Sequence, residues 1–195
     1  MNFEFAEQIN NELEKFHFNE ASRVAESELE IIPSTDFHTI LEKSMNVQAK
    51  ELAAWIEKFY KSTSKSINIK AMYFEMIEFD INTDIWSIDG FAFDKDGGLD
   101  LNDMEWLCDV TEETMTKSEF VLTGYEDLQN AFENITLDTD NLQNARDWCE
   151  QLIIVHFMEL MQTTHLIAKQ NNFAWANIPI YFTEHAYDFI VKSEN

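Results

Sequence analysis

Hydrophobic residues change their spacing twice along this chain, and the changes divide it into three parts. Near the amino terminus they recur three or four positions apart, as at Phe5, Ile9 and Leu13, which predicts amphipathic helices. From Ile67 the spacing falls to two, which is typical of a strand with one buried face. Helical spacing returns later. The pattern therefore predicts a helical part over 1–66, a sheet part over 67–124 and a second helical part over 125–195.

The first part is expected to hold several helices. One is predicted near 19–31, where it must end before Pro33, because proline cannot continue a helix. Asp36 is a suitable N-cap for a short helix after that proline. A further repeat, which starts at Leu52 and ends at Phe59, predicts a longer helix. Together these segments predict a small helical unit.

The middle part is expected to form an antiparallel sheet of three or four strands. Alternating residues predict strands over 67–81 and 85–93, and the polar turn at 82–84 predicts that they form a hairpin. Weaker strand signals cover 104–110 and 118–123. Sheets of this kind commonly pack one face on the core and show the other face to water.

The last part is dominated by a long helix predicted over 141–169. Its segment 152–161 is apolar nearly all round, which indicates a helix buried in the centre of the fold. A shorter helix is predicted over 125–135, and the tail predicts a last strand over 178–182 and a terminal helix over 183–191. Because no linker rich in proline, serine or glycine divides the chain, we expect one domain of the α+β class.

Charge is the compositional feature that adds most to this picture. The 195 residues carry 37 acidic and 13 basic side chains, a formal net charge of −24 at pH 7. Half of that charge lies within 75–113, where 13 carboxylates accompany the single lysine Lys95. Charge concentrated in one region can steer and select a partner of opposite charge. The negative charge of this chain disfavours direct binding to nucleic acids and anionic membranes, because both are negatively charged.

Other sequence features narrow the class of protein. Residues 1–10 lack a basic signal region, and no apolar run approaches the roughly 20 residues that cross a bilayer, so a cytoplasmic protein is expected. Cys108 and Cys149 form no Cys-x-x-Cys pair, which favours reduced thiols. The sequence also lacks the glycine-rich and Gly-x-Ser-x-Gly motifs of common phosphate-binding proteins, dinucleotide-binding proteins and hydrolases.

The segment 94–105 resembles an EF-hand calcium loop at its first four positions, at the hydrophobic eighth position Leu101 and at the closing Glu105. It departs from that family at Leu99, where the turn glycine belongs, and at Gly98, which has no side-chain oxygen. The resemblance implies calcium binding, or a looser calcium or magnesium site, by Asp94, Asp96, Asp100 and Glu105. An acidic hairpin turn without a metal is the alternative.

Two further groups could support an enzyme of unrecognised family. His156 and Glu159 stand three positions apart on the long helix, and such a pair can hold a transition metal when neighbouring helices add ligands. A buried polar pair with hydrogen-bond partners is the alternative. Cys108 and Cys149 are the available thiol nucleophiles, but no local motif places a histidine beside either of them.

The leading hypothesis is a cytoplasmic bacterial or phage protein that binds and inhibits a basic protein partner. In profile, a small acidic chain without catalytic motifs resembles toxin-immunity, anti-restriction and anti-CRISPR inhibitors. Carboxylates would stand in for nucleic-acid phosphates, and aromatic residues would anchor the interface. The expected contact residues are Asp84, Trp86, Asp89, Asp94, Asp96, Asp100, Asp103, Glu105 and Trp106. Alternatives are a calcium module, an enzyme, or a protein whose charge serves solubility while an apolar groove carries the function.

Overall fold

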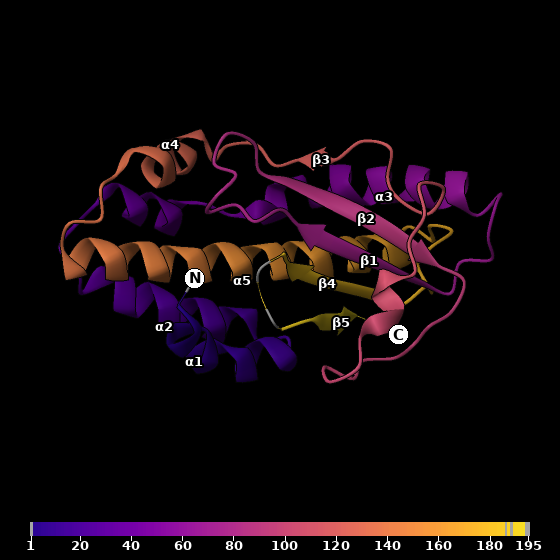
Figure 1. The fold of residues 1–195 in the computed structure, drawn as a ribbon, viewed down its shortest axis with the longest axis horizontal. Coiled ribbons are helices and arrows are strands. Elements are labelled where there is room, and N and C mark those ends of the chain that lie inside the picture. Colours follow the sequence, from indigo (N-terminus) through magenta and orange to yellow (C-terminus); the bar gives the residue numbers. More distant parts are fainter. Residues whose placement is uncertain (1, 186, 188, 194–195) are drawn as a thin grey trace.

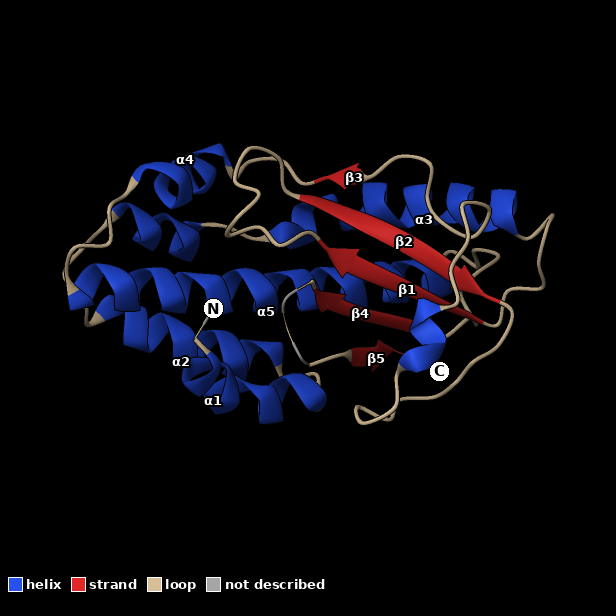
Figure 2. Cartoon of the chain, viewed as in Figure 1, coloured by secondary structure: helices blue, strands red, loops and turns tan. Residues whose placement is uncertain are grey.

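A computed structural model describes residues 2–185, 187 and 189–193 and shows an α+β fold, which confirms the predicted class (Figure 1). One half of the molecule is helical, and the other half contains a five-stranded sheet (Figure 2). The long helix α5 (Asp140–Gln170) runs through the helical half and continues behind the sheet. Residues from all three predicted parts contribute to one large core of buried apolar side chains.

The helices of the first part occur close to where the spacing predicts them. They are α1 (Phe3–Glu14), α2 (Phe18–Glu30) and α3 (Ala49–Thr63), with the 3-10 helices η1 (Asp36–Glu42) and η2 (Met45–Gln48) between α2 and α3. The N-cap of η1 is Thr35, not Asp36 as predicted, and the Thr35 backbone N–H donates to His38 Nδ1 at 3.1 Å. A residue with extended backbone is suited to the cap position, and Asp36 is already the first residue of the helix.

The sheet has the strand order β3-β2-β1-β4-β5. Its strands are β1 (Ala71–Met76), β2 (Ser87–Phe93), β3 (Phe120–Val121), β4 (Ile180–Glu184) and β5 (Val191–Ser193). The predicted hairpin is confirmed by the antiparallel β1–β2 pair, and β3 lies antiparallel to β2 within the predicted 118–123 strand. The predicted tail strand is also present, but β4 lies parallel to β1 inside the sheet, so the sheet is mixed.

The strand predicted over 104–110 is wrong, because this segment contains the 3-10 helix η3 (Glu105–Cys108). Met104, Trp106, Cys108 and Val110 occupy alternate positions and so imitate the spacing of a strand. In the structure the η3 turn directs Trp106 onto the sheet. The conformation of this segment is therefore determined by the burial of one large aromatic ring and not by strand pairing.

The terminal helix predicted over 183–191 is also wrong for the described residues. Thr183 belongs to β4 and Val191 to β5, and the chain between them turns back so that the two strands pair antiparallel. The Thr183 hydroxyl supports this turn by donating to the carbonyl oxygen of Phe189 at 2.8 Å. Positions 186 and 188, which fell within the predicted helix, lie outside the described residues.

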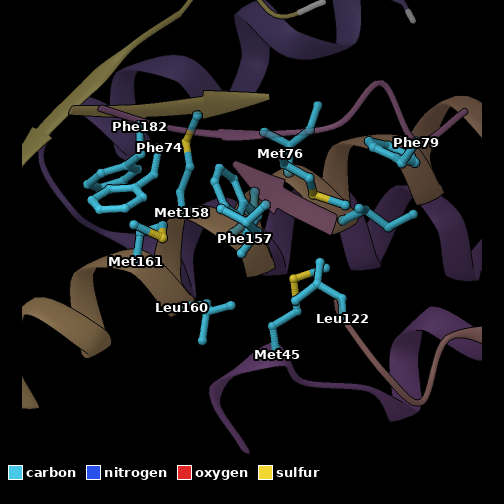
Figure 3. Close-up of a cluster of buried hydrophobic side chains, with 14 of the residues drawn as sticks. Met45, Phe74, Met76, Phe79, Leu122, Phe157, Met158, Leu160, Met161 and Phe182 are labelled. Carbon is cyan, nitrogen blue, oxygen red and sulfur yellow. The ribbon is translucent and has the colours of Figure 1, made fainter. Parts of the chain in front are cut away.

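The core is centred on α5, as predicted. Residues 152–161 are buried apart from the half-buried Glu159. Figure 3 shows Phe157 and Met161 of α5 beside Phe74 and Phe182 of the sheet. Each large side chain buried in this way contributes roughly 1.5–3 kcal/mol to the stability of the fold.

The short helix α4 (Glu126–Asn134) packs on η1. Within the described ranges, no helix combines the length and the apolar character needed to cross a membrane.

The two faces of the sheet are covered differently. The inner face packs on α5 and α3. The outer face carries a second, smaller cluster of buried side chains, formed by Ala71, Tyr73, Phe93, Trp106 and Tyr181. Trp106 comes from η3, which lies in front of the sheet on the side opposite α3 and α5 (Figure 1). The most acidic part of the chain therefore lies over the outer face.

Candidate functional site: an acidic loop on the outer face of the sheet

Residues 94–119 connect β2 to β3, and we call them the acidic loop. They carry nine carboxylates and only two lysines, Lys95 and Lys117. The exposed carboxylates are those of Asp94, Asp96, Asp100, Asp103, Glu105, Asp109, Glu112, Glu113 and Glu119. Asp84, in the turn between β1 and β2, is exposed as well. Most of the predicted acidic contact residues therefore lie on one continuous, solvent-facing segment.

Trp106 holds the acidic loop against the sheet. Only 8% of the residue is exposed, and its ring lies between those of Phe93 and Tyr181, with centroid distances of 5.0 and 5.1 Å. The indole Nε1 donates to the carbonyl oxygen of Gly98 at 3.2 Å. Gly97 lets the backbone approach this ring, because a Cβ at that position would lie 2.3 Å from the Trp106 ring.

Asp96 forms a second attachment between the acidic loop and the sheet. Its Oδ1 accepts hydrogen bonds from the Tyr181 hydroxyl and from the Gly98 N–H, and its Oδ2 lies 3.5 Å from Lys192 Nζ. Burial opposes ionisation of Asp96, but the hydrogen bonds and the lysine outweigh it, so the pKa of this carboxyl is lowered. Burial and the Asp96 bond raise the pKa of Tyr181 to about 12. Asp96 therefore ties the loop to β4 and β5.

Asp89 lies on the outer face of β2, directly opposite Glu75 of β1. Burial raises the pKa of the Asp89 carboxyl, and the charges of Glu119 and Glu75 raise it further. Glu75 accepts a hydrogen bond from Tyr73 at 3.1 Å and lies 3.0 Å from the His185 ring. These two strand carboxylates border a cavity of about 280 Å³, so the acidic surface extends from the loop onto the sheet.

The predicted aromatic anchors do not face solvent. Trp86 is 0% exposed, and its Nε1 donates to the carbonyl oxygen of Phe79 at 3.1 Å. Its ring packs against Tyr125 and Phe132 in the main core. The Trp106 ring packs between Phe93 and Tyr181 and so attaches the loop to the sheet. In this structure neither tryptophan offers a surface to a partner, because each is used to build the fold.

The four predicted calcium ligands do not converge. Asp96 is bonded to Tyr181, and Asp100 Oδ1 accepts from the backbone N–H of Asn102 at 3.0 Å, as in a tight turn. Asp94 directly follows β2, and Glu105 begins η3. Across 2–185, 187 and 189–193, no group of three or more His, Cys, Asp or Glu residues is arranged to hold a metal ion. Calcium binding therefore stays a prediction.

Of the candidate catalytic residues, His156 and Cys149 lie on α5 and only Cys108 lies on the acidic loop. His156 is buried, and burial lowers its pKa to about 4, so the imidazole is neutral at pH 7. Its Nδ1 has no hydrogen-bond partner among the described residues, in contrast to the expected polar pair. Burial raises the pKa of the Cys149 thiol, which disfavours the reactive thiolate. Cys108 is exposed on the acidic loop.

Sequence reasoning missed the residues that position the acidic loop. Tyr181 and Lys192 are distant from Asp96 in the sequence, 85 positions away in the case of Tyr181. No local pattern connects them, because parallel pairing of β4 with β1 brings them together.

Comparison of the chain with protein-family models, with curated proteins and with solved structures found no match.

Proposed function

We propose that the acidic loop binds a basic surface of a protein partner, in the cytoplasm, and thereby blocks a nucleic-acid-binding or nuclease site. The observation that carries the proposal is the exposure of the loop carboxylates on a segment whose base is fixed by Trp106 and Asp96. A surface that is ordered before it binds loses less conformational entropy on association than a flexible one. The attachments to the sheet thus favour a binding role.

Charge complementarity supplies the first part of the mechanism. Exposed carboxylates raise the rate of encounter with a basic surface, and this effect weakens as salt increases. Lys95 is already engaged by Asp109 within the loop, so it does not oppose such a partner strongly. The loop therefore presents a field of almost uniform sign.

Apolar side chains on the same loop supply the second part. Leu99, Leu101, Val110 and Met115 are exposed between the carboxylates, and Leu101 is 50% exposed. Apolar groups that become buried at an interface slow the release of a partner. These four residues take the anchoring role that the sequence assigned to Trp86 and Trp106.

The test is recovery of a partner from a bacterial lysate by the tagged protein at about 0.1 M salt, where charges act over about 10 Å, and again at about 0.5 M. Replacement of Asp94, Asp100 and Asp103 by lysine is expected to abolish recovery without unfolding the protein. The matched control replaces Glu7, Glu14 and Glu20, which are exposed on α1 and α2, by lysine. Equal loss with both triple variants would attribute binding to net charge and would contradict a role for the loop.

A further inference from the structure

A groove of about 630 Å³ lies between α3 and the end of the acidic loop. Trp55, Lys58 and Phe59 line it from α3, and Met115 and Lys117 line it from the loop. Small-molecule sites are typically concave and about 300–1,000 Å³ in volume, with mainly apolar walls and a few polar groups. The groove has this size, and three apolar side chains, those of Trp55, Phe59 and Met115, lie among mostly polar and charged ones.

The two lysines are the unusual feature of the groove. Carboxylates outnumber basic residues almost threefold in this chain, and several lysines, such as Lys43 and Lys61, are ion-paired, whereas Lys50, Lys65 and Lys70 form no ion pair among the described residues. Lys58 and Lys117 make no ion pair within 2–185, 187 and 189–193. Lys58 also begins a stretch, 58–74, that contains four lysines and no carboxylate. Positive charge is therefore available on both walls of the groove.

The remaining lining residues define what the lysines could hold. Trp55 and Phe59 offer aromatic surface, and serine and threonine hydroxyls line both walls. Glu112 and Glu113 line the groove too, so a ligand with several negative charges would be repelled. A single anionic group can approach the lysines while an uncharged ring system packs on the aromatic and methionine side chains.

We propose that this groove binds a small organic monoanion with an aromatic body, its acidic group held between Lys58 and Lys117 and its rings against Trp55, Phe59 and Met115. The groove shares Glu112, Glu113 and Met115 with the proposed interface, but lysines and aromatic rings hold its ligand, and it needs no basic partner. The groove binds a negatively charged ligand, whereas the proposed interface binds a positively charged surface. The test of the groove therefore does not depend on the outcome of the charge-reversal experiment.

The test uses two probes with the same ring system, anilinonaphthalene sulfonate, which is an anion, and phenylnaphthylamine, which is uncharged. The sulfonate is expected to bind saturably at one site in the folded protein, as followed by fluorescence and calorimetry. The uncharged probe should bind about tenfold more weakly, because it lacks the charge-assisted hydrogen bonds. Lys58→Gln and Lys117→Gln should each weaken sulfonate binding by about tenfold.

The control is Lys50→Gln, which removes an exposed lysine of the same helix outside the groove and should change the affinity by less than about twofold. Circular dichroism and melting curves would verify that all variants fold. Three results would overturn the proposal: no saturable binding of the sulfonate, equal affinity for both probes, or equal loss in Lys50→Gln and Lys58→Gln.

Discussion

The two faces of the sheet belong to the same strands but differ in what they contribute. On the inner face, Phe74, Met76 and Phe182 are fully buried against helices, in a core that extends through the molecule (Figure 3). On the outer face, a small aromatic cluster borders the carboxylates of Glu75 and Asp89. Like charges directly opposite each other on neighbouring strands reduce stability. The inner face therefore stabilises the fold, and the outer face is available for function.

The proposed binding role depends on this division. A partner that pairs with the outer carboxylates would relieve their mutual repulsion, and it would do so without disturbing the helices behind the sheet. Substitutions on the outer face should therefore alter the acidic loop and leave the fold in place. Substitutions on the inner face should reduce the stability of the whole fold.

The largest effect is expected for Phe157→Ala, on the helix behind the inner face. The ring is fully buried and lies 6.5 Å from that of Phe182, so its removal leaves a cavity. The free energy of unfolding should fall by about 3–5 kcal/mol, as measured by urea denaturation. Phe91→Ala, which removes a half-buried ring from the outer face, should cost about 1 kcal/mol. Equal costs for the two variants would contradict the division between the faces.

A smaller and more local effect is expected for Trp106→Ala. Loss of the ring between Phe93 and Tyr181 should reduce the free energy of unfolding by about 2 kcal/mol and release the acidic loop. Trypsin should then cleave faster after Lys95 and Lys117, while the far-ultraviolet circular dichroism stays near that of the wild type. Leu101→Ala, an exposed position in the same loop, is the control and should not increase cleavage. Unchanged cleavage in Trp106→Ala would show that this ring does not hold the loop.

The fold was predictable from the sequence where its causes are local. Helical spacing locates α3 and α5, and alternation with a polar turn locates the β1–β2 hairpin, because these patterns depend on residues a few positions apart. The place of β4 was not predictable in this way. Its parallel pairing with β1 joins segments about a hundred residues apart, and a strand pattern does not encode its neighbour.

The candidate site was predictable only in part. Exposure of Asp94, Asp100 and Asp103 follows from the free energy required to bury an unpaired charge, and the structure confirms that exposure. Burial of Trp106 was not predictable, because its alternating neighbours are equally compatible with a strand. The groove was also hidden, since Trp55 and Lys117 meet there only through tertiary packing. Local chemistry thus indicates which residues are exposed, and topology decides which of them lie together.

The buried carboxyl of Glu150 on α5 should respond to pH in the opposite sense to the outer carboxyl of Asp96. Burial raises the pKa of Glu150 from 4.5 to about 7, although Arg146 opposes the shift. The folded state therefore holds its proton more tightly than the unfolded state, and the stability from this group is lost as pH rises from about 4.5 to 7. Glu150→Gln should gain about 2 kcal/mol relative to the wild type between about pH 5 and pH 8, as measured by urea denaturation. A constant difference across this range would show that the pKa of Glu150 is not raised in the folded state.

The smallest effect is expected for Asp96→Asn, which tests the attachment of the outer face directly. The lowered pKa of Asp96 means that the folded state favours the ionised form, so its contribution is present above the unfolded pKa near 3.8 and is lost as pH falls through the lower folded pKa. Asp96→Asn should therefore lower the free energy of unfolding by about 1 kcal/mol at neutral pH and by less at about pH 3. Asp100→Asn, whose carboxyl bonds only within its own turn among the described residues, is the matched control and should show a smaller change. If Asp96→Asn and Tyr181→Phe are additive in a double-mutant cycle, the bond between them does not hold the loop, and Trp106 is left as the attachment that orders the proposed binding surface in advance.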